Sequence, residues 1–196
     1  MRIVGGRWGG RHLRVPRGLA VRPTSERVRE AAFAILADRV AGARVLDLFA
    51  GTGAMAIEAL SRGASEAVLV ESSDRAVGVL KANLAAVGAE RAACLGMDYR
   101  RAIRHLAARG EKFTLVFLDP PYGKGLVAAA AEALSTGGVL RQGAVVLAER
   151  AVRDPRDPVP DGWTATTDRR YGDTRITVYE VSSAAEGSVD RAGKEA

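Results

Sequence analysis

The sequence predicts an α/β fold in which a mainly parallel sheet is covered by helices on both faces. Three features predict it. Short apolar segments alternate with helical patterns through residues 44–148, which is typical of repeated βα units. A glycine-rich turn follows the first of these apolar segments. Two further apolar segments within residues 163–181 lie too close together for an intervening helix, so we expect them to pair as an antiparallel hairpin.

The predicted strands are short apolar runs, and the predicted helices carry apolar side chains at helical spacing. The first helix, residues 25–40, is expected to bury Val28, Ala31, Ala32, Ile35 and Leu36. The expected strands are residues 44–49, 67–70, 92–95, 113–118 and 144–148, followed by 163–167 and 175–181. The other expected helices run from the glycine-rich turn to residue 60 and over residues 74–87, 100–108 and 126–134.

The two ends of the chain differ from this alternating core. Residues 2–6 and 10–15 predict a small N-terminal β-hairpin around a glycine-rich turn. The last residues are small and polar, which is typical of a disordered segment. We therefore expect a basic hairpin arm over residues 1–24, one folded domain over residues 25–181 and a disordered tail over residues 182–196.

The composition excludes several classes of protein. No apolar run reaches the roughly eighteen residues that cross a bilayer, and no apolar signal-peptide segment follows Arg2. The single cysteine, Cys94, excludes an internal disulfide and a multi-cysteine metal site. Its expected role is that of a small buried apolar side chain. We expect a soluble, cytoplasmic monomer without a metal ion or membrane contact.

Positive charge is concentrated at the N-terminus. The chain carries a net charge of +6, and residues 1–25 contain six arginines and no acidic residue, so the remaining 171 residues carry no net charge. A neutral body with a cationic arm indicates a polyanionic partner, although a solvated arginine-rich surface would have the same composition. The candidate contacts to this polyanion are Arg2, Arg7, Arg11, Arg14 and Arg22.

The first motif runs from Asp47 to Ala56, between the first parallel strand and the next helix. It contains a G-x-G-x-x-A pattern, and Glu71 follows Gly53 by 18 residues. This spacing is typical of a nucleoside-binding βαβ unit, in which glycines let the ligand approach the backbone and the acid binds ribose hydroxyls. The candidate cofactor residues are Asp47, Phe49, Gly51, Gly53, Glu71 and Asp98.

NAD and S-adenosylmethionine both contain a nucleoside that suits this unit. S-adenosylmethionine lacks phosphates and has a charged amino acid end, and Asp47 could meet its ammonium directly or through water. Asp98, which follows the third strand, is placed to accept a hydrogen bond from the adenine amino group.

The second motif, Asp119-Pro120-Pro121-Tyr122, directly follows the fourth strand. In doubly wound sheets the first and fourth strands are neighbours where ligands bind, so we expect both motifs to border one crevice. An aromatic amine is a poor nucleophile, because its lone pair is delocalised into the ring. The Asp119 carboxylate and the Pro120 carbonyl can accept its two hydrogens, and the prolines restrict the backbone that carries these acceptors. Tyr122 can stack on a base swung out of its helix. All four residues are candidate catalytic residues, and they favour S-adenosylmethionine as the cofactor.

The two motifs together resemble those of class I Rossmann-like methyltransferases that act on amino groups of bases. The flanking segments resemble the RsmD family of bacterial 16S rRNA guanine-N2 methyltransferases. These segments are residues 2–6, Gly10-Arg11, residues 22–30 and Tyr171-Gly172-Asp173-Thr174. The resemblance covers roughly residues 1–181, and residues 22–30 are its most specific part.

This resemblance implies a Rossmann-like, seven-stranded and mostly parallel sheet whose last strand is antiparallel. It also implies S-adenosylmethionine-dependent transfer to N2 of one guanine of 16S rRNA, within a small-subunit assembly particle. By position, Asp119, Pro120 and Tyr122 match the catalytic motif of the family. Its cofactor pocket is matched by Asp47, Gly51, Gly53, Glu71 and Asp98. Arg22, Thr24 and Arg27 match the segment that borders its active site. Neither guanine nor the particular nucleotide follows from the residues themselves.

Other functions remain open from the residues alone. The Asp-Pro-Pro-Tyr motif also serves adenine-N6 methyltransferases on DNA or RNA, although no separate target-recognition domain is evident. A C5-cytosine methyltransferase is disfavoured because Cys94 is poorly placed as a nucleophile. A catalytically inactive rRNA-binding assembly factor and an NAD-dependent oxidoreductase are the remaining alternatives.

Overall fold

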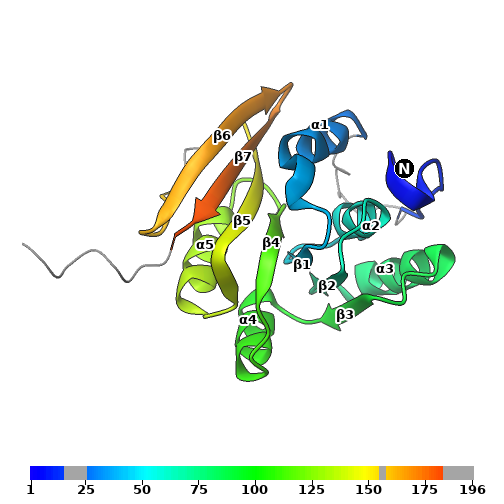
Figure 1. Ribbon diagram of the computed structural model, residues 1–196, viewed down its shortest axis with the longest axis horizontal. Coiled ribbons are helices and arrows are strands. Elements are labelled where there is room, and N and C mark those ends of the chain that lie inside the picture. The colour runs from blue at the N-terminus through cyan, green and yellow to red at the C-terminus, as the bar shows by residue number, and fades with distance from the viewer. Residues whose placement is uncertain (16–25, 155–157, 183–196) are drawn as a thin grey trace, which may run out of the picture.

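The computed structural model describes residues 1–15, 26–154 and 158–182, in which strands and helices alternate as predicted (Figure 1). In chain order the elements are η1 (Gly6–Trp8), α1 (Glu26–Leu36), η2 (Ala37–Arg39), β1 (Arg44–Asp47), α2 (Ala54–Ser61), β2 (Glu66–Glu71), α3 (Asp74–Val87), β3 (Ala92–Gly96), α4 (Tyr99–Ala108), β4 (Phe113–Leu118), α5 (Leu126–Thr136), β5 (Leu140–Ala151), β6 (Trp163–Tyr171) and β7 (Thr174–Val181). Residues 183–196, most of the predicted tail, lie outside the described residues.

The sheet has seven strands in the order β3-β2-β1-β4-β5-β7-β6. Strands β1 to β5 pair in parallel, and β7 pairs antiparallel with both β5 and β6. The predicted fold class is therefore confirmed, including the neighbouring first and fourth strands. Sheets of this kind bind ligands where the strand order reverses, which here is at β1 and β4.

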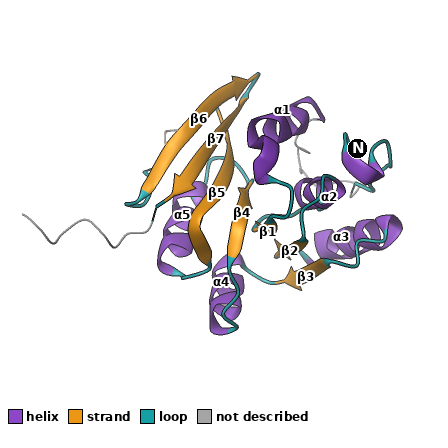
Figure 2. Cartoon of the chain, in the orientation of Figure 1, coloured by secondary structure: helices purple, strands orange, loops and turns teal. Residues whose placement is uncertain are grey.

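Helices cover both faces of the sheet (Figure 2). A first core cluster packs α1, α2 and α3 on one face, where the rings of Phe33 and Phe117 meet edge to face with centroids 6.0 Å apart. A second core cluster packs α4 and α5 on the other face. Neighbouring residues of β4 divide between the two, with Phe117 in the first cluster and Val116 in the second, because side chains alternate along a strand.

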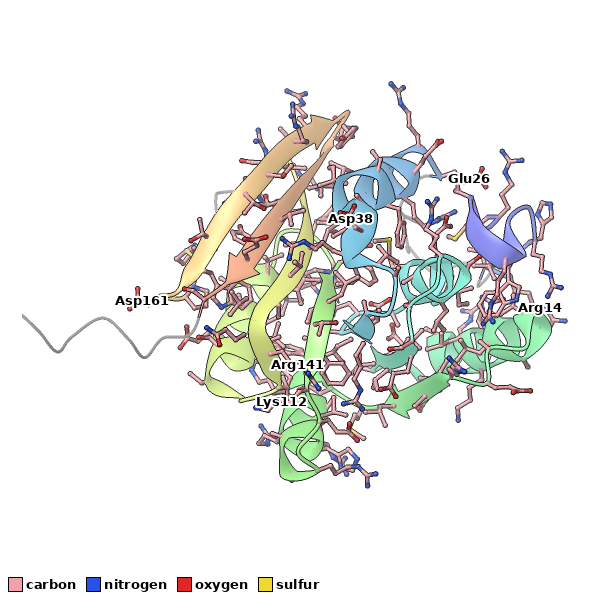
Figure 3. All side chains as sticks on the ribbon, viewed as in Figure 1. Arg14, Glu26, Asp38, Lys112, Arg141 and Asp161 are labelled. Atoms are coloured by element: carbon pink, nitrogen blue, oxygen red, sulfur yellow. The ribbon has the colours of Figure 1, made fainter. Side chains whose placement is uncertain are left out.

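The N-terminal segment, residues 1–15, packs into the first core instead of extending from it. Ile3, Trp8 and Leu13 are buried there. The expected hairpin is reduced to a single bridge between Arg2 and His12, with η1 between its two sides. Each side of this bridge buries an apolar side chain in the core, Ile3 on one side and Leu13 on the other. The arginines of residues 1–15 are therefore carried by a segment that is docked on the domain. Arg14, for example, lies beside α3 (Figure 3).

The buried face of α1 differs from the expected one. The structure buries Arg29 and Phe33, whereas Ala31 and Ile35 are only partly buried. Arg29 is fully buried because its guanidinium pairs with the equally buried Glu58 of α2, with Nε and Oε2 3.1 Å apart. The helix is therefore rotated toward a charged partner that apolar periodicity does not predict.

Two predictions about strands are also corrected. β5 begins at Leu140, which pairs with Phe113 of β4. β5 and β6 also continue to Ala151 and Tyr171, because β7 pairs with both strands up to the turn at Gly172. The added residues are largely polar and exposed, so they carry no apolar signal. Cys94, expected to be buried, is partly exposed because β3 is an edge strand of the sheet.

Candidate functional site

Two turns leave the sheet side by side at the carboxyl ends of β1 and β4. Asp47, the last residue of β1, is in register with Phe117 of β4, two residues before Asp119. Just beyond β1, the Leu48 amide donates a 3.2 Å hydrogen bond to the Phe117 carbonyl. The structure therefore brings the glycine-rich turn and the Asp119–Tyr122 segment to one edge of the sheet.

The glycine-rich turn is tied to the end of β2 by Glu71. The Glu71 carboxylate accepts hydrogen bonds from the amides of Gly51, at 2.9 Å, and Ser73, at 2.8 Å. Gly53 begins α2 with a φ of +82°, and a Cβ there would lie 2.4 Å from a methyl group of Leu80. Glycine is required at this position for both reasons. A Cβ on Gly51 would instead meet nothing within 4 Å, so space remains beside the turn.

Asp47 is a buried carboxylate with an unsatisfied oxygen. Its side chain is 2% exposed, and Oδ2 has no hydrogen-bond partner. Burial is the main cause that raises the pKa of Asp47 to about 7, and the negative charge of Glu71 raises it further. Backbone amides at Phe49 and Ala56 oppose this rise. A buried carboxylate of this kind is stabilised by a cationic group.

Two further predicted cofactor residues lie at the same edge of the sheet. Asp98 is exposed and caps α4, with Oδ1 accepting a 2.9 Å hydrogen bond from the Arg100 amide. The ring of Phe49 packs against Tyr99, with centroids 5.2 Å apart. Tyr99 was not predicted as a site residue, and its buried hydroxyl has no partner. The site thus combines carboxylates, an aromatic pair and open space, which suit a nucleoside with hydroxyl and ammonium groups.

Pro120, Pro121 and Tyr122, which follow Asp119, border a pocket of about 140 Å³. Pro120 is buried, Asp119 and Tyr122 are half-buried, and Pro121 is exposed. The Tyr122 hydroxyl donates a 2.7 Å hydrogen bond to Glu149 and lies 3.4 Å from the Thr174 hydroxyl. One side of the pocket is formed by Glu149, Arg150 and Asp154. Glu149 and Thr174 were not predicted as site residues.

The predicted RNA contacts divide into three groups. Arg2 is paired with Glu26 at 3.0 Å, so its charge is compensated within the protein. Arg7, Arg11, Arg14 and Arg27 are exposed. The Arg7 guanidinium lies 3.9 Å from the centroid of the Trp8 ring. Arg22 and Thr24 lie outside the described residues.

Glu58 gathers the N-terminal segment, α1 and α2 around one carboxylate. It accepts hydrogen bonds from the Val4 and Gly5 amides, both at 2.8 Å, and also binds Arg29 and Arg62. The sequence patterns did not reveal this network. The available signal was Glu58 itself, a glutamate inside the otherwise apolar α2.

Comparisons with known proteins identify the family. Residues 1–180 match the family described as conserved hypothetical protein 95. The chain is 37% identical to ribosomal RNA small subunit methyltransferase D of Escherichia coli K12, over 97% of this chain and 94% of that protein. The chain belongs to the RsmD family.

Other RsmD-family comparisons agree. The Haemophilus influenzae protein of the same name is 30% identical, over 92% of this chain and 93% of its own length. Among solved structures, the protein yhhF from Escherichia coli superposes with a TM-score of 0.83 at 32% identity, covering 93% and 98% of the two chains. Protein TTHA0928 of Thermus thermophilus gives 0.78 at 34% identity, covering 92% and 99%. The chain is thus a methyltransferase with the predicted RsmD-type fold.

Within residues 1–15, 26–154 and 158–182, no helix has the length and apolarity required to cross a membrane. The same residues contain no group of three or more His, Cys, Asp or Glu side chains suited to a metal ion.

Proposed function

We propose that this protein transfers the methyl group of S-adenosylmethionine to the exocyclic N2 amine of a guanine in 16S rRNA, within a small-subunit assembly particle. The observation that carries the proposal is the adjacency of two turns at β1 and β4, since one borders a nucleoside-type site and the other carries Asp119. The Escherichia coli and Haemophilus influenzae relatives are named as ribosomal RNA small subunit methyltransferases, which supports small-subunit rRNA as the substrate.

The residues at the β1 edge fit S-adenosylmethionine. The unsatisfied Oδ2 of Asp47 suits the ammonium group, and the Glu71 carboxylate suits the ribose hydroxyls while it holds Gly51. Asp98, Phe49 and the space beside Gly51 suit the remainder of the nucleoside. When bound, this cofactor supplies a methyl group on a positively charged sulfur, which is already activated for transfer.

The Asp119–Tyr122 segment prepares the acceptor amine. The Asp119 carboxylate and the Pro120 carbonyl accept its two hydrogens, which orients the lone pair and makes it more available for attack. Asp119 also accepts the proton that the amine releases once it carries the new methyl group. Alignment of this kind lowers a barrier by as much as about 7–11 kcal/mol.

Exposed arginines on the docked N-terminal segment and at the start of α1 form the proposed RNA surface. These side chains are Arg7, Arg11, Arg14 and Arg27. Their charges suit phosphate groups, which supply sequence-independent affinity. We assign base recognition to the Asp119–Tyr122 segment. The proposed location of the protein is the cytoplasm, where small-subunit particles assemble.

The proposal is tested by incubating the purified protein with methyl-labelled S-adenosylmethionine and, separately, DNA, free 16S rRNA and small-subunit particles from cells that lack this gene. The modified nucleoside is then mapped and identified by mass spectrometry. Label on guanine N2 in the particle is the expected result. Label on adenine N6 would replace guanine as the target. Cofactor binding without transfer to any substrate would instead favour an inactive assembly factor.

A further inference from the structure

Tyr122 is held by two buried side chains from strands far along the chain. Its hydroxyl donates a 2.7 Å hydrogen bond to Oε1 of Glu149 and lies 3.4 Å from Oγ1 of Thr174. Glu149 is 4% exposed and Thr174 is 6% exposed. Because the phenol has one hydrogen and gives it to Glu149, the Thr174 hydroxyl is the donor in the second contact.

The antiparallel pairing of β5 and β7 brings these two partners together. Glu149 is opposite Ile176, and Thr174 is opposite Ala151, the next residue on the same face of β5. Both side chains therefore point to one face of the sheet as diagonal neighbours. Thr174 is also the last residue of the Tyr171–Thr174 turn, one of the segments that resemble the RsmD family. That resemblance gives the turn no role of its own.

Tyr122 acts as a neutral hydrogen-bond donor in this arrangement. Burial is the main cause that raises the pKa of the Tyr122 hydroxyl far above its ordinary value of 10, and the charge of Glu149 raises it further. The hydrogen bond from Thr174 opposes this shift. The phenol therefore keeps its proton at physiological pH and serves as an anchor for the segment that carries it.

We propose that Glu149 and Thr174 are positioning residues for methyl transfer. They fix the Tyr122 ring as a wall of the pocket and, through it, hold the backbone of the Asp119–Tyr122 segment in register with the glycine-rich turn. A second tie holds the next residue of the chain, since Asp154 accepts a 3.1 Å hydrogen bond from the Gly123 amide. The kinetic part of this inference rests on the proposed function.

The test compares Thr174→Val, Glu149→Gln and Tyr122→Phe with the parent protein. A hydrogen bond to a charged group changes an equilibrium constant about tenfold or more, so we expect a loss of kcat of that size for Tyr122→Phe and a smaller, several-fold loss for Thr174→Val. The dissociation constant for S-adenosylmethionine is expected to change less than about twofold, because the cofactor pocket is untouched.

Two conservative variants are expected to retain most of kcat. Glu149→Gln keeps a hydrogen-bond acceptor, and Thr174→Ser keeps a hydroxyl. Coupled residues act as one unit, so the Tyr122→Phe/Thr174→Val double variant is expected to match Tyr122→Phe.

Thr177→Val is the matched control. Thr177 is also a buried threonine of β7, 2% exposed, but its hydroxyl lies 3.4 Å from Asp168 and away from Tyr122. We expect this variant to keep the parent kcat. If Thr174→Val and Thr177→Val lowered kcat equally, or if both losses followed the melting temperature, the positioning role would be overturned.

A second measurement separates this inference from the proposed function. Tyrosine labelled with ¹³C at Cζ gives one resonance for each of the four tyrosines, and Tyr122→Phe assigns that of Tyr122. We expect this resonance to shift in Thr174→Val and Glu149→Gln but not in Thr177→Val, whether or not any RNA is methylated. An unchanged resonance would refute the anchoring of Tyr122, whereas an inactive parent with the expected shifts would refute only the proposed function.

Discussion

The two turns at the β1 and β4 edges are stabilised in different ways. The glycine-rich turn is held by the Gly51 amide, which donates to Glu71 at the end of the adjacent β2 strand. The Asp119–Tyr122 segment is held through one phenol hydroxyl by Glu149 and Thr174, which are 27 and 52 residues away in the chain. The cofactor side is therefore built within one β1–α2–β2 unit, and the acceptor side depends on the assembled β5–β7 pair.

This contrast has a consequence for variants. Substitutions at the first turn should alter the affinity for the cofactor, whereas substitutions at the second should alter the rate of transfer with the cofactor still bound.

The largest effect is expected for Asp119→Ala. Loss of a preorganised polar group at the reacting centre costs about 10²- to 10³-fold in kcat, and this variant should fall at least that far. Its dissociation constant for S-adenosylmethionine should match that of the parent in a calorimetric titration. Asp119→Asn, which keeps one acceptor oxygen, is the control and should retain more activity. Undiminished turnover in Asp119→Ala would remove this residue from the mechanism.

Glu71→Ala should show the opposite pattern. Removing a charged hydrogen-bond partner costs about 1.5–3 kcal/mol, so the cofactor should bind about tenfold more weakly or worse. The rate at saturating cofactor should change much less. Glu71→Gln keeps an acceptor for one of the two amides and should fall between parent and alanine variant. Equal affinities for all three proteins would exclude Glu71 from the cofactor site.

The affinity for the cofactor should also depend on pH through Asp47. With a pKa of about 7, the Asp47 carboxyl is about 90% ionised at pH 8 and about 10% at pH 6. A ligand ammonium group requires the carboxylate, so we expect binding to weaken about tenfold from pH 8 to pH 6. Asp47→Asn should bind weakly with a flat profile over this range. A parent profile as flat as that of the variant would show that Asp47 does not meet the ammonium group.

The same ionisation affects folding with the opposite sign. Because the folded-state pKa of Asp47 lies above its ordinary value of 3.8, this group stabilises the ligand-free protein fully below about pH 4. That contribution is lost as the pH rises through about 7. Cofactor binding should therefore raise the melting temperature more at pH 8 than at pH 6.

The division between the two turns also explains what the sequence could predict. The glycine pattern, the 18-residue spacing to Glu71 and the Asp119–Tyr122 motif are local signals, and the β1–β4 pairing places them at one edge. Glu149, Thr174 and Tyr99 could not be predicted in the same way, because their roles depend on which strands and rings meet in the folded protein. The Arg29–Glu58 pair was missed for a related reason, since a buried charge runs against the apolar periodicity from which helix faces are predicted.

The smallest single-residue effects are expected at the proposed RNA surface. If the four exposed arginines neutralise roughly four phosphates, log affinity for the rRNA particle should fall against log salt with a slope of about −3 to −4. Arg7→Ala and Arg11→Ala should each make this slope shallower by about 1, because each removes one phosphate contact. Arg2→Ala is the matched control, since the charge of Arg2 is already paired with Glu26, and its slope should stay close to that of the parent. A parent slope near zero would mean that these arginines only solvate the surface. Equal changes in all three variants would show that Glu26 does not screen Arg2 from the RNA.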